Sequence, residues 1–322
     1  MQPVPTAQPT RSQTTSPFGP LVVIVDPSAG GGAVGRQLDE VRSVIGASGL
    51  SHRIEVAASP GAVPGIARAA FDAGMRFIGA VGDDATVQAV VNAAFRDGAT
   101  IVERPVIGVV SAGTGCELVR SFGLPDDVEG AVTHLAGEAT YPLDVMKLTC
   151  VGQGGDRTTR YGHNMVQIGF RAAVARRTIG VPPGEGRVRR FVAFWATYLA
   201  WRSRDITVDV DTRSHRLRAW DVLVANGQFA DGGQRVSPRS YPGDGVLDAL
   251  AFVGPKADAY RMLPRIFMNG GHLPDPGVKE LRSKIRVAVE GDRPLPVTLD
   301  GRPVGVTPAT VQIVPQQVLL KL

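Results

Sequence analysis

The chain has 322 residues, of which 43% are hydrophobic and 20% charged, and its formal net charge is +5. This length and composition favour a folded protein of two domains, and the absence of any run of about 18 apolar residues predicts that no helix spans a membrane. The two cysteines, Cys116 and Cys150, lack the spacing of metal ligands and are too few for a disulfide framework. We therefore expect the protein to reside in the reducing environment of the cytoplasm.

The first 18 residues predict a disordered tail, because they are rich in Gln, Pro, Thr and Ser and lack the apolar core of a secretory signal. Beyond them, apolar runs alternate with helix-like segments. Strands are expected at 21–25, 51–57, 76–81 and 105–110, and helices at 33–46, 64–73, 86–95 and from 117 onward. This alternation predicts a doubly wound α/β domain with a parallel sheet over residues 19–141.

From residue 142 the chain has many strand-like segments and few long helices. The expected strands are 142–152, 161–170, 205–211, 216–226, 246–253, 284–290 and 295–300. They predict an antiparallel β-rich domain over residues 142–304, with one helix at 187–201. Residues 305–322 end in a strand, 318–322, that could return to either domain.

Three short turns rich in Gly and Asp follow strands of the first domain, at 26–32, 82–86 and 112–115. Backbone N–H groups at helix N-termini bind phosphate, and glycine lets the backbone approach it closely. Because the carboxyl ends of parallel strands meet at one edge of a sheet, the three turns predict one shared anion site. The residues expected to bind a nucleotide there are Asp26, Pro27, Gly30, Gly31, Gly82, Asp83, Thr86, Gly113, Thr114 and Gly115.

Asp84 is the candidate catalytic residue of the second turn. Phosphoryl transfer needs a cradle for the phosphates, a divalent cation and a carboxylate near the accepting hydroxyl. An Asp at the carboxyl end of a strand could accept the proton of an alcohol or hold the metal. The structural alternative is that Asp84 caps the helix that follows it. Beside the other two turns, we favour the catalytic role.

Further candidates lie in the second half of the chain. Asp244 and Asp248 are two carboxylates with a carbonyl between them, which suits a hard cation. Asp-Gly is also an ordinary turn, and from the residues alone we favour the turn, at Asp300-Gly301 as well. The aromatic side chains of 187–201 and the arginines around them suit either a core or a lipid surface, since basic and aromatic residues favour that interface. His163, with the other scattered histidines, is interpreted as an ordinary core or surface residue.

Together these residues resemble the diacylglycerol kinase catalytic family, which also contains sphingosine kinases and bacterial lipid kinases. The family pattern Asn-Pro-x-Ser-Gly is similar to 26–30, Gly-Gly-Asp-Gly-Thr to 82–86, and Gly-Thr-Gly-Asn-Asp to 113–117. Later, the Asp-Gly-x-Leu-Asp motif is similar to 244–248, and the Asp-Gly-Glu motif to 300–302.

The resemblance implies a nucleotide-binding α/β domain, a β-sandwich lipid domain, and a cleft between them. It implies ATP- and Mg²⁺-dependent phosphorylation of a lipid hydroxyl at a membrane surface, most simply diacylglycerol to phosphatidic acid. By analogy, Asp84 takes the catalytic or metal-organising position, Asp300 is a second candidate base, and Asp244 and Asp248 take a magnesium position. The family also implies peripheral membrane association and a possible homodimer, whereas no motif indicates a nucleic-acid partner.

The chain departs from the family pattern inside its motifs. Asp83 and Ala85 replace glycines, Ala89 replaces a Glu, Cys116-Glu117 replaces Asn-Asp, and Arg302 replaces the Glu of the late motif. Asp83 places negative charge near the expected polyphosphate, which is unfavourable without a bridging cation. The alternatives are therefore a catalytically inactive nucleotide- or lipid-binding relative, and a sphingoid-base or NAD kinase-like activity.

Overall fold

The structure, a computed structural model, describes residues 16–181, 186–255, 257 and 271–322. The first 15 residues of the predicted tail lie outside the described residues. The last three were wrongly assigned to a disordered tail, because Phe18 packs edge-on against Phe77 with ring centroids 5.9 Å apart. Among the described residues, no helix is both long and apolar enough to cross a membrane.

The first half of the chain forms the predicted doubly wound domain. Its parallel strands lie in the order β2 (His52–Val56), β1 (Leu21–Val25), β3 (Phe77–Val81) and β6 (Val106–Val110). The last three are fully buried, as expected for apolar strands covered on both faces. A small hairpin, β4 (Phe95–Arg96) with β5 (Ala99–Thr100), follows the fourth helix.

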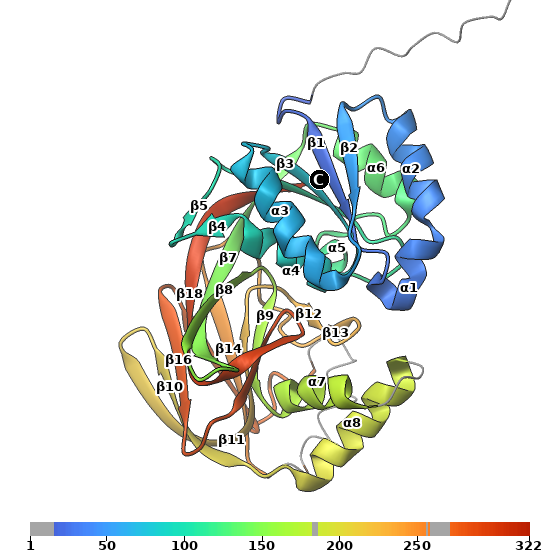
Figure 1. The fold of residues 1–322 in the computed structure, drawn as a ribbon. Helices are drawn as coiled ribbons and strands as arrows, with labels where there is room; N and C mark the ends of the chain where they lie inside the picture. The colour runs from blue at the N-terminus through green and yellow to red at the C-terminus, as the bar shows by residue number, and fades with distance from the viewer. Residues whose placement is uncertain (1–15, 182–185, 256, 258–270) are drawn as a thin grey trace, which may run out of the picture.

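Helices cover both faces of this sheet (Figure 1). One face packs against α3 (Val63–Asp72) and α4 (Asp84–Ala93), with a short 3₁₀ turn, η1 (Pro60–Ala62), before α3. The other packs against α1 (Ala29–Arg36), α2 (Leu38–Ala47) and α6 (Val128–Ala136). The single helix expected at 33–46 is therefore two helices. The helix expected from residue 117 onward is α5 (Glu117–Phe122).

The second half forms an antiparallel β-sandwich, as predicted. Its strands are β7 (Thr140–Gly152), β8 (Arg157–Gly162), β9 (Met165–Gly169), β10 (Arg204–Val210), β11 (Arg213–Ala225), β12 (Phe229–Ala230), β13 (Gln234–Arg235), β14 (Leu247–Val253), β15 (Val278–Ser283), β16 (Arg286–Gly291), β17 (Pro296–Leu299) and β18 (Arg302–Lys321). Strand β9 pairs with β11 and β17, and its Val166 and Ile168 lie in one core with residues of both strands.

Two helices, not one, interrupt this domain within the part of the chain that the structure describes. The expected strand 161–170 ends at Gly169, where the chain turns into α7 (Phe170–Gly180). The predicted helix follows as α8 (Gly186–Ala200), and the two helices lie side by side (Figure 1).

The C-terminal strand joins the two halves. Strand β18 pairs with β16 and β17 in the sandwich and with β7 along most of its length. Its end then lies parallel to β6, with Leu319 opposite Val106. The chain therefore returns to the first domain within a continuous hydrogen-bonded sheet, so the two halves share one framework. Residue 142, where we predicted the domain boundary, lies inside β7.

Candidate active site

The three predicted turns meet at one edge of the parallel sheet. Thr114 Oγ1 donates a hydrogen bond to the carbonyl oxygen of Gly82 at 3.1 Å, which joins the third turn to the second. Gly30 lies so close to the third turn that a Cβ there would be 2.8 Å from Thr114 Cγ2. Thr86 Oγ1 lies 3.5 Å from Asp26 Oδ2, which joins the second turn to the first. The turns therefore form one surface, whereas nucleotide binding by it stays a prediction.

The first turn has a backbone that only glycine adopts at low cost. Gly30, Gly31 and Gly32 have consecutive positive φ angles of 61°, 67° and 85°. Gly30 and Gly31 are exposed, so their backbone is open to an approaching phosphate.

Two carboxylates shape these turns from within. Asp83 caps α4, because its Oδ1 accepts hydrogen bonds from the backbone N–H groups of Ala85 and Thr86 at 3.1 Å each. Buried Asp26 accepts from the N–H and the hydroxyl of Ser28 at 3.0 and 2.6 Å. The negative charge of Asp83 is thus directed at backbone donors, which explains how the altered turn keeps its shape.

Asp84 does not cap its own helix, contrary to the structural alternative above. Its two carboxylate oxygens accept from the N–H of Glu117, at 2.9 and 3.0 Å, at the start of α5. Oδ1 also accepts from the Cys116 thiol at 3.1 Å. Burial, and then the nearby Asp84 charge, raise the pKa of that thiol, which disfavours a thiolate nucleophile. The Asp84 side chain remains 22% exposed and lines a cavity, so it can also meet a ligand.

Asp300 is held too firmly to be the second base that we expected. Its buried carboxylate accepts from the backbone N–H groups of His163, Asn164 and Met165 at 2.9, 3.0 and 2.8 Å. Burial raises the pKa of Asp300, but the charge of His163 and these N–H donors outweigh it and lower the pKa overall. The Asp300 side chain is also fully buried, whereas that of Asp84 is 22% exposed, so an acceptor hydroxyl can reach Asp84 but not Asp300. We therefore interpret Asp300 as a structural anion.

His163, interpreted above as ordinary, lies between the two aspartates. Its ring is fully buried, with Nδ1 3.2 Å from Asp300 Oδ2 and Nε2 3.9 Å from Asp84 Oδ1. Neither ring nitrogen has hydrogen-bond geometry, so the contact is electrostatic. Burial lowers the pKa of His163, but the two carboxylates, chiefly Asp300, raise it to about 10. The site therefore holds an imidazolium between two carboxylates, a pairing that no local sequence spacing indicates.

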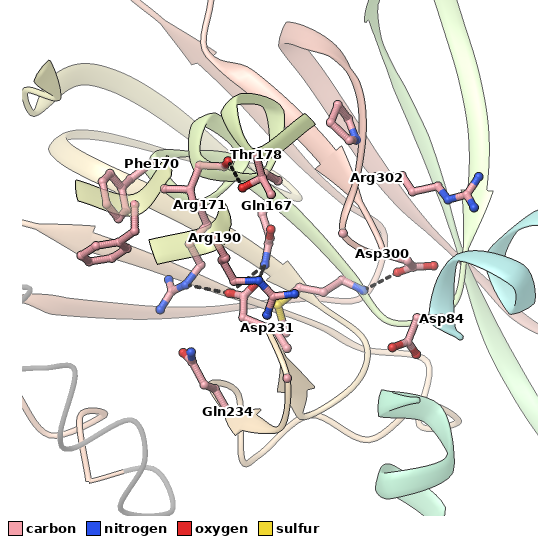
Figure 2. Close-up of a pocket in the computed structure, with 18 of the residues that line it drawn as sticks. Asp84, Gln167, Phe170, Arg171, Thr178, Arg190, Asp231, Gln234, Asp300 and Arg302 are labelled. Carbon is pink, nitrogen blue, oxygen red and sulfur yellow. Dashed lines mark hydrogen bonds and ion pairs between the residues drawn. The ribbon is translucent and has the colours of Figure 1, made fainter. Parts of the chain in front are cut away.

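A cavity of about 520 Å³ extends from these carboxylates into the second domain. Figure 2 shows Asp84 and Asp300 at one end, Phe170 at the opposite end, and Arg190 and Asp231 between them. The apolar part is lined by Met165, Phe170, Val174, Ala175, Ile179, Phe194, Trp220 and Ala230. A largely apolar cavity with acidic groups at one end suits an amphipathic alcohol.

An ion-pair network forms one wall of the cavity. Arg171 Nη1 lies 2.8 Å from Asp221 Oδ2, and its Nε lies 3.3 Å from Asp231 Oδ2. Gln167 Nε2 donates to the same Asp231 carboxylate at 3.3 Å. Burial, only partly offset by Arg171, raises the pKa of Asp221 to about 7. Sequence reasoning missed this network, because its members are far apart in the chain.

Glu117, noted above as a departure, links the two domains at the cavity. Its Oε1 accepts from the N–H groups of Gly232 and Gly233 at 2.8 Å each. Its Oε2 is buried without a hydrogen-bond partner and lies 3.6 Å from Arg120 Nε. Burial outweighs the backbone hydrogen bonds and raises the pKa of Glu117 to about 6.

Asp244 and Asp248 do not join this site, and their surroundings do not fit the expected magnesium. Buried Asp248 accepts from Ser240 Oγ and from Arg282 Nε at 2.8 Å each. Arg282 Nη2 also lies 3.8 Å from Asp244 Oδ2. The guanidinium thus supplies the positive charge between the two carboxylates. Across the described ranges, no three His, Cys, Asp or Glu side chains gather as metal ligands.

Known proteins resemble this chain along most of its length. Residues 20–148 match the family model of the diacylglycerol kinase catalytic domain, and residues 164–321 match that of the YegS C-terminal NAD kinase beta sandwich-like domain. A "Probable lipid kinase YegS-like" protein of Stenotrophomonas maltophilia is 24% identical over 300 residues, which cover 88% of this chain and 92% of that protein. A diacylglycerol kinase of Bacillus subtilis is 21% identical over 237 residues, which cover 71% of this chain and 72% of that protein.

The fold agrees with a solved structure. A crystal structure of a diacylglycerol kinase from Bacillus anthracis has a TM-score of 0.69 at 17% identity, and the match covers 95% of this chain and 98% of that one. The two family models together cover most of the chain, so this chain carries a diacylglycerol kinase catalytic domain at 20–148, followed by a YegS C-terminal NAD kinase beta sandwich-like domain at 164–321.

Proposed function

We propose that this protein is a lipid kinase that transfers the γ-phosphoryl group of ATP to a lipid hydroxyl, with diacylglycerol as the first candidate acceptor. The observation that carries the proposal is the position of Asp84. It lies within the second glycine turn, at the first residue of α4, and also lines the apolar cavity. One carboxylate therefore lies between a surface suited to phosphates and a space suited to a lipid.

In the proposed reaction the acceptor lies in the cavity with its hydroxyl toward Asp84. The carboxylate accepts the hydroxyl proton as the lipid oxygen forms a bond to the γ-phosphorus. The bond from that phosphorus to the β,γ-bridging oxygen breaks, and ADP leaves. Asp84 is held for this task by the N–H of Glu117 at the start of α5. Its position is thus fixed by the backbone before any ligand binds.

The buried imidazolium of His163 balances the charge of this acidic end. It lies 3.9 Å from Asp84 and 3.2 Å from Asp300. Two carboxylates beside an incoming polyphosphate would otherwise repel it. Magnesium, expected with ATP, would neutralise phosphate charge. Glu117 is the candidate to hold it, because its buried Oε2 accepts no hydrogen bond, has only Arg120 Nε beside it at 3.6 Å, and lies at the same cavity end.

The test is transfer of labelled γ-phosphate from Mg²⁺-ATP to diacylglycerol, ceramide, sphingosine or a crude lipid extract in mixed micelles, and to NAD. Asp84→Asn is the test variant. Asp127→Asn is the matched control, because Asp127 also caps a helix but lies outside the cavity. We expect labelled lipid from the wild type and the control, and none from Asp84→Asn.

Two results would replace the proposal. ATP binding without any labelled lipid would favour the inactive, ligand-binding relative. Labelled NAD without labelled lipid would favour the NAD kinase-like activity. If only sphingosine or ceramide were labelled, the protein would still be a lipid kinase, but its acceptor would not be diacylglycerol.

A further inference from the structure

Helices α7 and α8 carry an apolar surface that their own packing does not need. Ile179, Val188, Phe191 and Val192 are 67%, 55%, 64% and 47% exposed, and we name these four residues the α7–α8 apolar face. Val188, Phe191 and Val192 are three and four positions apart on one helix, so they share a side of it. Arg189 Nη2 donates to the carbonyl oxygen of Thr178 at 2.9 Å, which places Ile179 beside the start of α8.

The opposite side of α8 already supplies the protein core. Ala193 and Thr197 are buried, and Phe194 packs edge-on against Phe170 with ring centroids 5.4 Å apart. A helix that is apolar on a second side is normally covered by protein or by lipid. Exposed apolar clusters of this kind mark interaction surfaces, whereas single exposed apolar side chains are ordinary.

The charges around the face indicate an anionic partner. Arg176 and Arg177 are exposed at the end of α7 that carries Ile179, and no ion pair joins them to a carboxylate of the described residues. Neither α7 nor α8 contains an Asp or Glu. Apolar side chains flanked by arginine match the interface of an anionic bilayer, where the apolar groups enter the acyl boundary and the arginines meet lipid phosphates.

The face is continuous with the cavity. Ile179 belongs to the face and lines the cavity, and Arg189 and Arg190 line it as well. Figure 2 shows Arg190 extending beside Asp231 between the two ends of the cavity. A surface bound to lipid here would bring a membrane lipid to the cavity.

We propose that the α7–α8 apolar face docks on an anionic bilayer, and that the acceptor passes from the bilayer into the cavity beside Ile179 and Arg190. The second part rests on the proposed function, whereas docking itself does not. The occupant is a lipid surface and not a second copy of the chain, because the arginines around the face would repel their counterparts in a symmetric pair.

The experiment measures partitioning of the full chain onto vesicles of phosphatidylcholine alone and of phosphatidylcholine with phosphatidylglycerol. Phe191→Ser/Val192→Ser removes apolar contact, and Ile285→Ser is its control, because Ile285 is another exposed apolar residue, 61% exposed, on the turn before β16. Arg176→Gln/Arg177→Gln removes charge, with Arg216→Gln/Arg218→Gln on β11 as its control.

We expect each test variant to bind the anionic vesicles at least about tenfold more weakly than the wild type, and each control to bind as the wild type does. On neutral vesicles, Arg176→Gln/Arg177→Gln should bind almost as strongly as the wild type. Equal binding by test and control variants would overturn the proposal. So would a dimer that Phe191→Ser/Val192→Ser dissociates without any change in vesicle binding.

A second readout separates docking from catalysis. For Phe191→Ser/Val192→Ser, the ratio of activity on vesicle-borne diacylglycerol to activity on a dispersed short-chain diacylglycerol should fall at least about tenfold. An unchanged ratio would overturn the route of the acceptor. If the wild type phosphorylates no lipid in either form but binds anionic vesicles through this face, the kinase proposal fails and the docking proposal stands.

Discussion

Because the charge of His163 is buried between carboxylates, we predict that the protein loses stability as the pH rises from neutral. Its buried imidazolium lies between Asp300 and Asp84, and its pKa is raised from 6.5 to about 10. A group whose pKa is higher in the folded state than in the unfolded state stabilises the fold. Its full contribution is present when the pH is below the unfolded-state pKa. That contribution disappears as the pH rises through the folded pKa.

The magnitude follows from the two pKa values. Because a difference of one in pKa corresponds to about 1.4 kcal/mol, a pKa of about 10 against 6.5 gives an upper limit of about 5 kcal/mol. Between about pH 6.5 and about pH 9.5 the protein should lose about 3 kcal/mol of its free energy of unfolding through this group. The contact lacks hydrogen-bond geometry, so the effect should fall at or below this value.

The assay is urea unfolding of the wild type and of His163→Gln across this pH range. Glutamine has no charge to lose, so the variant should be less stable than the wild type near neutral pH and should depend less on pH. The difference between the two proteins isolates His163 from other groups that titrate at high pH. Parallel pH profiles would refute the reasoning, because they would mean that His163 is neutral in the folded protein.

Three further predictions concern other parts of the framework. Gly82→Ala should lower the free energy of unfolding in urea by at least about 2 kcal/mol, because its Cβ would clash with the side chain of Thr86. Gly46→Ala should not, because a Cβ there would meet no side chain within 4 Å. Glu117→Ala should destabilise the protein in the same assay by about 1–3 kcal/mol by leaving two N–H donors unpaired, and Glu117→Gln, which keeps the acceptor, should lose less. Arg282→Met should lower the free energy of unfolding by about 3 kcal/mol, because buried Asp248 loses its counter-ion and keeps only Ser240 as a donor. The Tm of the wild type should not change with EDTA, and a fall in Tm with EDTA would indicate a bound metal in place of this ion pair.

The meeting of the three turns could be predicted because it follows from topology. Turns after neighbouring parallel strands must lie at one edge of the sheet, so the contact of Thr114 with Gly82 needed only the order of the strands. The role of each carboxylate could not be predicted in this way. Asp83 and Asp84 are adjacent in sequence, yet one caps α4 and the other caps α5. That difference depends on where a second helix begins.

The misassigned features depend on partners that are distant in sequence. Asp248 and Arg282 face each other across β14 and β15, a cross-strand pair that replaces the expected cation and that the Asp-Gly-x-Leu-Asp motif does not reveal. His163 meets Asp300 across 137 positions. Helix α7 was missed because only Phe170 and Ala172 are buried on it, which leaves no apolar stripe of helical period.

The central claim is that Asp84 accepts the hydroxyl proton at the acidic end of the cavity. Its most direct test is the steady-state kinetics of Asp84→Asn with Mg²⁺-ATP and a dispersed short-chain diacylglycerol, because Asn can still cap α5. We predict that kcat falls by about 10³ while the KM for ATP changes by no more than about threefold. A kcat within about tenfold of the wild type, or a loss confined to KM, would contradict the account and leave Asp84 as a helix cap.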